Sequence, residues 1–376
     1  MAGTEYPHNN SGPGDQFIAA GPQNNNSGSG SQWNAHTINF NAVPSAAQES
    51  DESLFADLHV TDPRDDKDRI EHTKGGLLRG SYSWILENPD FQEWRNGSEK
   101  RLLWVRGDPG KGKTMLLCGL INELENDGAE PVYFFCQATD SRLNTATAVL
   151  RGLIYLLLQK RPSLTRFVRE RHRHGGKRFF EDANSWTALG RILVQMLSQE
   201  DQAMERIVLV IDALDECTDA DDLVDLVVKI SSTTTRVIVS SRNWPNIQQG
   251  MEAAEQQRQI CLELNADSVS AAVSTYTNYK VDQLAQQKGY DKTLRDEVQS
   301  YLLSNSDGTF LWVSLVTQRL GDRKLPKRRT LARLREFPQG LDALYSRMLD
   351  QALEAEDADI RKNVMAVSRQ WKPNRL

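Results

Sequence analysis

Short apolar runs, separated by longer amphipathic stretches, fill the middle of the chain. The runs are rich in Val, Ile, Leu and aromatic residues, as buried strands are. The strands expected from them are Leu102–Val105, Val132–Cys136, Ile207–Ile211, Arg236–Ser240 and Gln259–Leu264. The helices expected between them are Lys113–Glu125, Thr145–Gln159 and Trp186–Leu197. This alternation predicts an α/β fold in which a mostly parallel sheet is flanked by helices on both faces.

The pattern changes on either side of this core. From Asp267 onward the strands stop and helical spacing takes over, with a turn at Asn305–Gly308 and a basic linker at Arg323–Arg335. The helices expected there are Ser268–Gln287, Thr293–Leu303, Thr309–Leu320 and Leu341–Ala355. Upstream, residues 51–100 are charged and amphipathic, while residues 1–50 are rich in Asn, Gly, Ser, Gln and Pro and are predicted to be disordered.

These shifts predict five parts in the chain. They are a tail at 1–50, a helical lead-in at 51–100, an α/β core at 101–265, a helical domain at 266–338 and the start of a further helical domain at 339–376. Residues 369–376 do not form an obvious structural stop, so two interpretations of the last part stay open: it is truncated, or it leads into a different tail.

Overall composition narrows the function classes. The net charge is −6, so nothing global points to nucleic acid or to an anionic membrane. The apolar runs are too short to span a bilayer. The first fifty residues contain no Lys or Arg, which a secretory or mitochondrial leader needs, so we expect a cytoplasmic protein. The four cysteines lie in or beside apolar segments, which favours structural thiols: Cys118, Cys136, Cys217 and Cys261.

A phosphate-binding loop follows the first strand of the core. Its residues are Gly107, Asp108, Pro109, Gly110, Lys111, Gly112, Lys113 and Thr114, which fit GxxxxGK[ST] between a strand and a helix. The glycines let backbone N–H groups turn toward phosphates, and the helix N-terminus adds its positive end. We expect Lys113 to reach the β- and γ-phosphates and the Thr114 hydroxyl to bind Mg²⁺.

A second polar group follows the most hydrophobic strand. Asp212 ends this strand, at the sheet edge where open α/β folds place ligands, and is predicted to hold the same Mg²⁺. Asp215 and Glu216 come next, and one of them is a candidate to orient or deprotonate the attacking water. Alternatively, the pair caps the helix that begins near Asp219.

Two further groups of polar residues each allow a functional and a structural interpretation. Arg242 follows the strand Arg236–Ser240 and is a candidate sensor of the γ-phosphate, with a surface ion pair as the alternative. His172 and His174 lie among arginines in what the pattern indicates is a solvated basic loop rather than a metal site.

Together, the P-loop, the strand ending at Asp212 and the strand before Arg242 resemble the NACHT class of signal-transducing NTPases. The chain is most similar to the fungal NOD-like receptor branch with a nephrocystin-3-like N-terminal NTPase region. The supporting motifs are Asp62–Arg64, Asp68–Glu71, Lys74–Leu78 and Trp84–Leu86 upstream, with Gly308–Val313 and Gly340–Tyr345 downstream. The resemblance covers roughly residues 60–350.

The resemblance implies a switch. Such proteins rest with ADP, exchange it for ATP when a C-terminal repeat domain senses a ligand, then oligomerise and activate an N-terminal effector. Two departures stand out. No repeat period follows residue 350, and the last histidine is His174, whereas the family's winged-helix region often supplies a histidine to the bound ADP.

The tail contains a short repeat. Gly14–Phe17 recurs as Gly30–Trp33 within Asn-, Gly- and Ser-rich sequence. This resembles the sigma-type amyloid signalling motif of fungi, in which paired segments stack as rungs with amide ladders. The alternative is a flexible linker.

We therefore expect a Mg²⁺- and ATP-dependent signalling switch in fungal immunity or incompatibility, with GTP not excluded by the sequence. Its expected partners are the nucleotide, other copies of itself and an effector templated by the tail, with no nucleic acid and no membrane span. The alternatives are a housekeeping ATPase or kinase-like enzyme and a non-hydrolysing adaptor scaffold. Slow NTP hydrolysis would distinguish the switch from these alternatives. The sequence itself does not establish the rate of hydrolysis.

Overall fold

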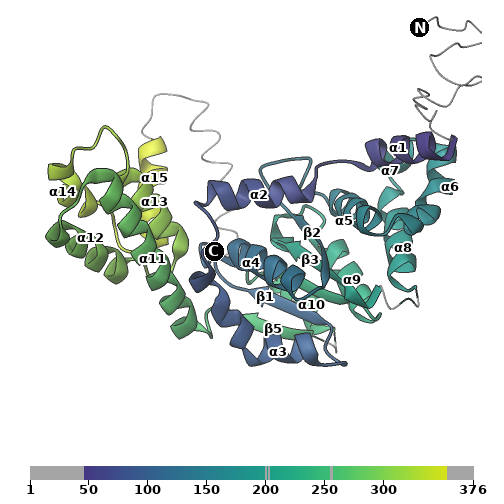
Figure 1. The fold of residues 1–376 in the computed structure, drawn as a ribbon, viewed down its shortest axis with the longest axis horizontal. Helices are drawn as coiled ribbons and strands as arrows, with labels where there is room; N and C mark the ends of the chain where they lie inside the picture. Colours follow the sequence, from purple (N-terminus) through teal and green to yellow (C-terminus); the bar gives the residue numbers. More distant parts are fainter. Residues whose placement is uncertain (1–45, 200, 202–203, 255–256, 354–376) are drawn as a thin grey trace, which may run out of the picture. The chain divides into compact units, whose positions relative to one another are not determined.

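The structure is a computed structural model that describes residues 46–199, 201, 204–254 and 257–353 (Figure 1). The chain divides into two compact units, residues 1–52 and 53–376, and the second unit contains the sheet and the candidate site. The predicted tail and its amyloid motif lie outside the described residues, except that helix α1 (Ala46–Leu58) begins inside the predicted tail.

Five parallel strands form one sheet in the order β2-β3-β4-β1-β5. The strands are β1 (Leu102–Arg106), β2 (Glu130–Phe135), β3 (Ile207–Asp212), β4 (Arg236–Ser241) and β5 (Gln257–Cys261). Every residue of β3 is buried, and β1, β2 and β4 are buried except at one end. Successive side chains point to opposite faces of a strand, so both faces of the sheet are covered. The predicted α/β fold is confirmed.

Strand β4 lies between β1, which precedes the P-loop, and β3, which ends at Asp212. In its register, Val105 pairs with Ser240 and Ile211 pairs with Val239. The carboxyl ends of β1, β4 and β3 therefore meet side by side at one edge. This edge carries the P-loop, the residues after β4 and Asp212.

Helices of the core pack on this sheet or on the helices that cover it. They are α4 (Lys113–Asn126), α5 (Ala146–Lys160), α8 (Ser185–Leu197), α9 (Ala220–Ser231) and α10 (Pro245–Glu252). Helix α4 contacts β2, β3 and β4, and α5 contacts β2. The Thr145 hydroxyl caps α5 by accepting the Ala148 N–H at 3.2 Å. These helices bury long apolar side chains, so the edge that carries the P-loop and Asp212 is supported by a packed core.

The lead-in also contains helices, which begin at caps that the sequence encodes. Helix α2 (Pro63–Thr73) starts with Pro after Asp62, and α3 (Pro89–Asn96) starts with Pro after Asn88. Both cap side chains accept backbone N–H groups of the first turn, the arrangement that favours a helix start.

The edge strand β5 is polar and short. Only Ile260 is fully buried in it, and Arg258 forms an ion pair with Glu93 of α3. Helix α3 packs against both β5 and β1. At the opposite edge, β2 contacts α2 and α5.

The predicted basic loop around His172 is wrong. Residues Arg166–Gly175 form helix α6, followed by α7 (Arg178–Glu181). His172 is buried, and its Nε2 lies 2.8 Å from Asp57 Oδ2. Val168 and His172, one helical turn apart, are the buried positions of α6, while its arginines cover the outside. The many charged residues of this segment obscure its helical period in the sequence.

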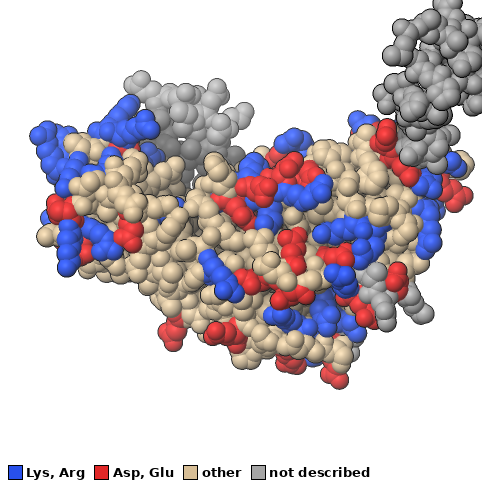
Figure 2. All heavy atoms as spheres, viewed as in Figure 1, with Lys and Arg blue, Asp and Glu red and all other residues tan. Residues whose placement is uncertain are grey.

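Beyond the sheet, helices follow one another: α11 (Ala266–Lys288), α12 (Lys292–Asn305), α13 (Phe310–Leu320), α14 (Thr330–Leu334) and α15 (Leu341–Leu353). The predicted basic linker is folded rather than extended, because Thr330 and Leu334 are buried one turn apart and hold α14 in place. Figure 2 shows basic side chains gathered over α14. Within the described ranges, no helix is long and apolar enough to cross a membrane.

Candidate functional site

The P-loop connects β1 to α4 and depends on two left-handed glycines. Gly110 has φ of 81° and Gly112 has φ of 87°, and Gly112 is the N-cap of α4. Residues with a Cβ rarely adopt this backbone conformation. The loop is anchored to the neighbouring strand because the Gly107 N–H donates to Ser241 O at 3.3 Å. The sequence motif thus has the strand–loop–helix setting that phosphate binding requires.

Lys113 is folded back onto its own loop. Its ammonium donates to Gly107 O at 2.5 Å and to Asp108 O at 3.1 Å. Burial lowers the pKa of Lys113, although Asp215 and Asp212 oppose this shift. The side chain is a mostly buried cation that is held by neutral carbonyl oxygens. A phosphate would give it an anionic partner, which forms the stronger, charge-assisted hydrogen bond.

Asp212 and Thr114 are brought together across the sheet edge. The Asp212 carboxylate is buried and accepts hydrogen bonds from the Ser240 hydroxyl, at 2.5 Å, and from Thr114. Burial raises the pKa of Asp212, while these two hydrogen bonds act against that rise. Ser240 Oγ also accepts the Ala213 N–H at 2.9 Å, which fixes the chain just after β3.

These residues fit Mg²⁺ that arrives with a nucleotide. Carboxylate and hydroxyl oxygens are ligands that Mg²⁺ prefers, and it is usually held by one or two protein oxygens plus phosphates and water. No group of three or more His, Cys, Asp or Glu side chains suited to a metal occurs among the residues that the structure describes.

Asp215 and Glu216 have different surroundings. Asp215 forms an ion pair with Arg242, with Oδ2 at 3.0 Å from Nε, and also accepts the Arg242 N–H at 2.9 Å. Glu216 accepts the Ala138 N–H at 3.0 Å and lies 3.9 Å from the Arg242 guanidinium. Burial raises the pKa of Glu216. Both carboxylates therefore bind groups other than the first turn of α9. This does not support the alternative interpretation, in which they cap that helix.

The backbone after β3 is unusual at the same point. Ala213 has φ of 57°, a left-handed conformation that is uncommon for a residue other than glycine. It turns the chain into the short helix Leu214–Glu216. Strained residues of this kind cluster at functional sites.

Two residues of the site are not identified by sequence reasoning. In the sequence, Ser240 is only part of a polar group at the end of a strand, yet it connects Asp212 to the chain after β3. Glu263 accepts the Asp108 N–H at 2.6 Å and so braces the start of the P-loop. Nothing in the local pattern around Glu263 signals this contact, since the two residues are 155 positions apart.

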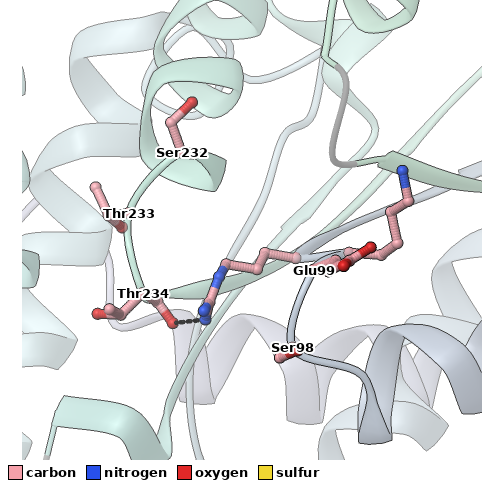
Figure 3. A pocket seen from close by; sticks show the side chains of 7 residues that line it. Ser98, Glu99, Ser232, Thr233 and Thr234 are labelled. Carbon is pink, nitrogen blue, oxygen red and sulfur yellow. Dashed lines mark hydrogen bonds between the residues drawn. The ribbon is translucent and has the colours of Figure 1, made fainter.

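A separate hollow lies at the other end of the sheet. Its volume is about 570 Å³, and Figure 3 shows the polar side chains around it. They come from the residues just before β1 and β4, where Arg101 Nη1 donates to Thr234 O at 2.7 Å. The P-loop and Asp212 are at the carboxyl ends of the strands, so this hollow is not part of the candidate site.

Comparisons with known proteins agree with the motifs. Residues 80–242 match the family described as Nephrocystin 3, N-terminal. The chain is 50% identical over 323 residues to the vegetative incompatibility protein HET-E-1 of Podospora anserina. This alignment covers 85% of the chain but only 24% of the relative, so the chain spans about a quarter of that protein.

Solved structures give weaker likenesses. The replication initiator DnaA bound to AMPPCP and single-stranded DNA has a TM-score of 0.37 and 15% identity, covering 77% of this chain and 76% of that one. C. elegans PCH-2 has a TM-score of 0.37 and 12% identity, covering 80% of this chain and 72% of that one.

The family match begins before the P-loop and ends at Arg242, so it contains the P-loop, Asp212 and Arg242, whereas most of the supporting motifs lie outside it. Residues 80–242 therefore match the nephrocystin-3 N-terminal family, in agreement with the resemblance that the motifs indicate.

Proposed function

We propose that the chain binds a magnesium–nucleoside triphosphate at the P-loop and acts as a slowly hydrolysing signalling switch. One observation carries the binding proposal: Lys113, Thr114 and Asp212 converge at one sheet edge with a mostly buried cation and a buried carboxylate. ATP is the proposed nucleotide, with GTP as the alternative. The proposed limits are 101–265 for the NTPase core and 266–338 for the helical domain.

Each residue has a proposed role. Lys113 binds the β- and γ-phosphates, and the backbone N–H groups of the loop surround them. Thr114 and Asp212 hold Mg²⁺, directly or through water. The bound ion neutralises phosphate charge. Ser240 keeps the Asp212 carboxylate oriented through its hydroxyl.

Glu216 is the better candidate for the residue that orients or deprotonates water. Asp215 binds Arg242 with both carboxylate oxygens and has only 3% of its side chain exposed. Glu216 is more exposed, at 33%, and its raised pKa suits a proton acceptor. We propose that Asp215 holds Arg242, which contacts the γ-phosphate and reports on nucleotide state.

The signalling part of the proposal rests on relatives and on the tail. The 50% identity to a vegetative incompatibility protein supports a role in incompatibility or cell-death signalling. We propose that triphosphate binding leads to oligomers, and that the repeated segments at 14–17 and 30–33 then stack and template an effector protein. Clustering supplies the local concentration that nucleation needs.

The binding proposal is tested with fluorescent ATP and GTP analogues and Mg²⁺ on the purified chain. Lys113→Ala should weaken binding by about 100-fold or more, since it removes charged hydrogen bonds to two phosphates. Lys229→Ala, an exposed lysine at the end of α9, is the matched control and should bind as the parent does. Equal affinity of Lys113→Ala and the parent would remove the phosphate-site assignment.

Hydrolysis separates the two carboxylates and the function classes. Glu216→Gln should bind nucleotide but hydrolyse it about 100-fold or more slowly. If Asp215→Asn alone abolishes turnover, the roles are reversed. A switch should turn over well below about 10 per second, whereas a metabolic enzyme would approach that rate. Size-exclusion chromatography with a non-hydrolysable triphosphate tests oligomer formation.

A further inference from the structure

The turn between α12 and α13, residues 306–309, lies against the P-loop. The ammonium of Lys111 donates to Asp307 O at 3.3 Å and to Gly308 O at 3.2 Å. Both acceptors belong to left-handed residues, with φ of 49° at Asp307 and 60° at Gly308. An aspartate in this conformation is uncommon and persists where its surroundings fix it. A lysine from a site 196 residues earlier is part of those surroundings.

The first residues of α13 close on the same loop. The Leu311 N–H donates to Gly110 O at 3.4 Å. A Cβ placed on Gly110 would lie 2.8 Å from Leu341 Cδ2 and 3.2 Å from Leu311 Cβ, and one on Gly112 would lie 2.8 Å from Phe310 Cδ2. The helical region therefore packs so tightly on the P-loop that it leaves no room for a side chain there.

The same turn is connected to the start of α15. The Gly340 N–H donates to Asn305 O at 3.0 Å, and the indole of Trp312 donates to Pro338 O at 2.9 Å. Leu341, the first residue of α15, is the one that approaches Gly110. Turn 306–309 is thus the point where the P-loop, α13 and the chain leading into α15 meet.

We propose that Lys111 is a positioning residue that ties the P-loop to turn 306–309, so that phosphate in the loop stabilises the docked helical region. This rests on the proposed nucleotide binding. Phosphate bound to the backbone N–H groups of the loop fixes Gly110 and Lys111, whose carbonyl and ammonium are the two groups that hold the turn. Linkage then requires the reverse: a docked turn strengthens nucleotide binding by the same free energy.

Hydrogen exchange of the whole chain, read by mass spectrometry, measures docking of the turn. Mg²⁺ and ADP are used as the ligand, at concentrations that saturate each variant according to its own measured affinity. In the parent, the peptide covering residues 307–312 should exchange about tenfold more slowly with ligand than without it. Lys111→Met should lose this protection while ligand is bound, and Lys111→Arg should keep it because it retains the donors.

The control is Lys292→Met, which changes an exposed lysine at the start of α12 and should match the parent. Lys111→Gln is the second variant in case Lys111→Met does not fold. Full protection of residues 307–312 in ligand-bound Lys111→Met or Lys111→Gln would overturn the proposal.

A comparison without nucleotide distinguishes failure of this inference from failure of the proposed function. If the parent binds no nucleotide, the proposed function fails. The tie is still tested, because nucleotide-free Lys111→Met should exchange faster than the parent at residues 307–312. Identical exchange of the two nucleotide-free proteins would show that Lys111 does not hold the turn against the P-loop.

Discussion

Replacing Gly112 by alanine should destabilise the protein through two separable effects. The backbone at Gly112 is left-handed, with φ of 87°, which costs a residue with a Cβ about 1 to 2 kcal/mol. The new Cβ would also lie 2.8 Å from Cδ2 and 3.0 Å from Cε2 of Phe310, and relieving such a contact costs about 1 to 3 kcal/mol. We therefore expect Gly112→Ala to lower the free energy of unfolding by about 2 to 5 kcal/mol.

Phe310→Ala separates the two effects. In that background the ring is absent, so Gly112→Ala should cost only the backbone part, and the coupling energy of the double-mutant cycle should be about 1 to 3 kcal/mol. Gly289→Ala is the matched control. Gly289 is also left-handed, with φ of 63°, but nothing lies within 4 Å of its added Cβ, so it should cost the backbone part alone.

Urea unfolding followed by circular dichroism measures these free energies, and the variants must share the m value of the parent for the comparison to hold. The reasoning would be refuted if Gly112→Ala cost the same in both backgrounds within about 0.5 kcal/mol. That result would mean that Phe310 does not pack on the P-loop in solution.

The site and the tail support three further predictions. Asp212→Asn should raise the unfolding midpoint at neutral pH, because burial raises the pKa of Asp212 and the ionised carboxylate therefore destabilises the fold. The gain should disappear below pH 3.8, where the carboxyl is protonated in both the folded and the unfolded state. A lower midpoint at neutral pH would contradict this reasoning. Hydrolysis should decline as the pH is lowered toward 4.5, because the pKa of Glu216 is raised above that usual value and its carboxylate takes up a proton. Nucleotide affinity measured at each pH is the control, and a profile that stays flat down to pH 4.5 excludes Glu216 as proton acceptor. A peptide of residues 1–45 should bind thioflavin T and give a reflection near about 4.7–4.8 Å, and changing Gln16 and Gln32 to Lys should prevent both.

The strands could be predicted from the sequence because their signal is local. The run Ile207–Ile211 is apolar at every position, and in the structure every one of those residues is buried. Strand order is different, since nothing within β4 indicates that it lies between β1 and β3. That order depends in part on pairing between segments that are far apart in the chain, as between Leu102 and Val237.

The candidate site was predictable to a similar degree. The P-loop and Asp212 can be found because each motif is a contiguous run with its own strand beside it. The Arg242–Asp215 ion pair cannot, because it forms only when β3 and β4 are side by side. Helix α6 has the sequence of a basic loop because only Val168 and His172 are buried in it, too few apolar positions to reveal a helical period.

The polar edge strand β5 has a consequence for a protein that is proposed to signal through amyloid. An open strand edge presents unpaired N–H and C=O groups, so the edge of a folded sheet is also a template on which another strand can add. Strand β5 is short, carries Arg258 and packs against α3, whose Glu93 holds that arginine in place. Such an edge is a poor template, so we expect the core sheet to resist recruitment into a fibril formed by the proposed amyloid segment. Replacing Arg258 by valine would weaken this protection and make β5 a better template for the addition of another strand.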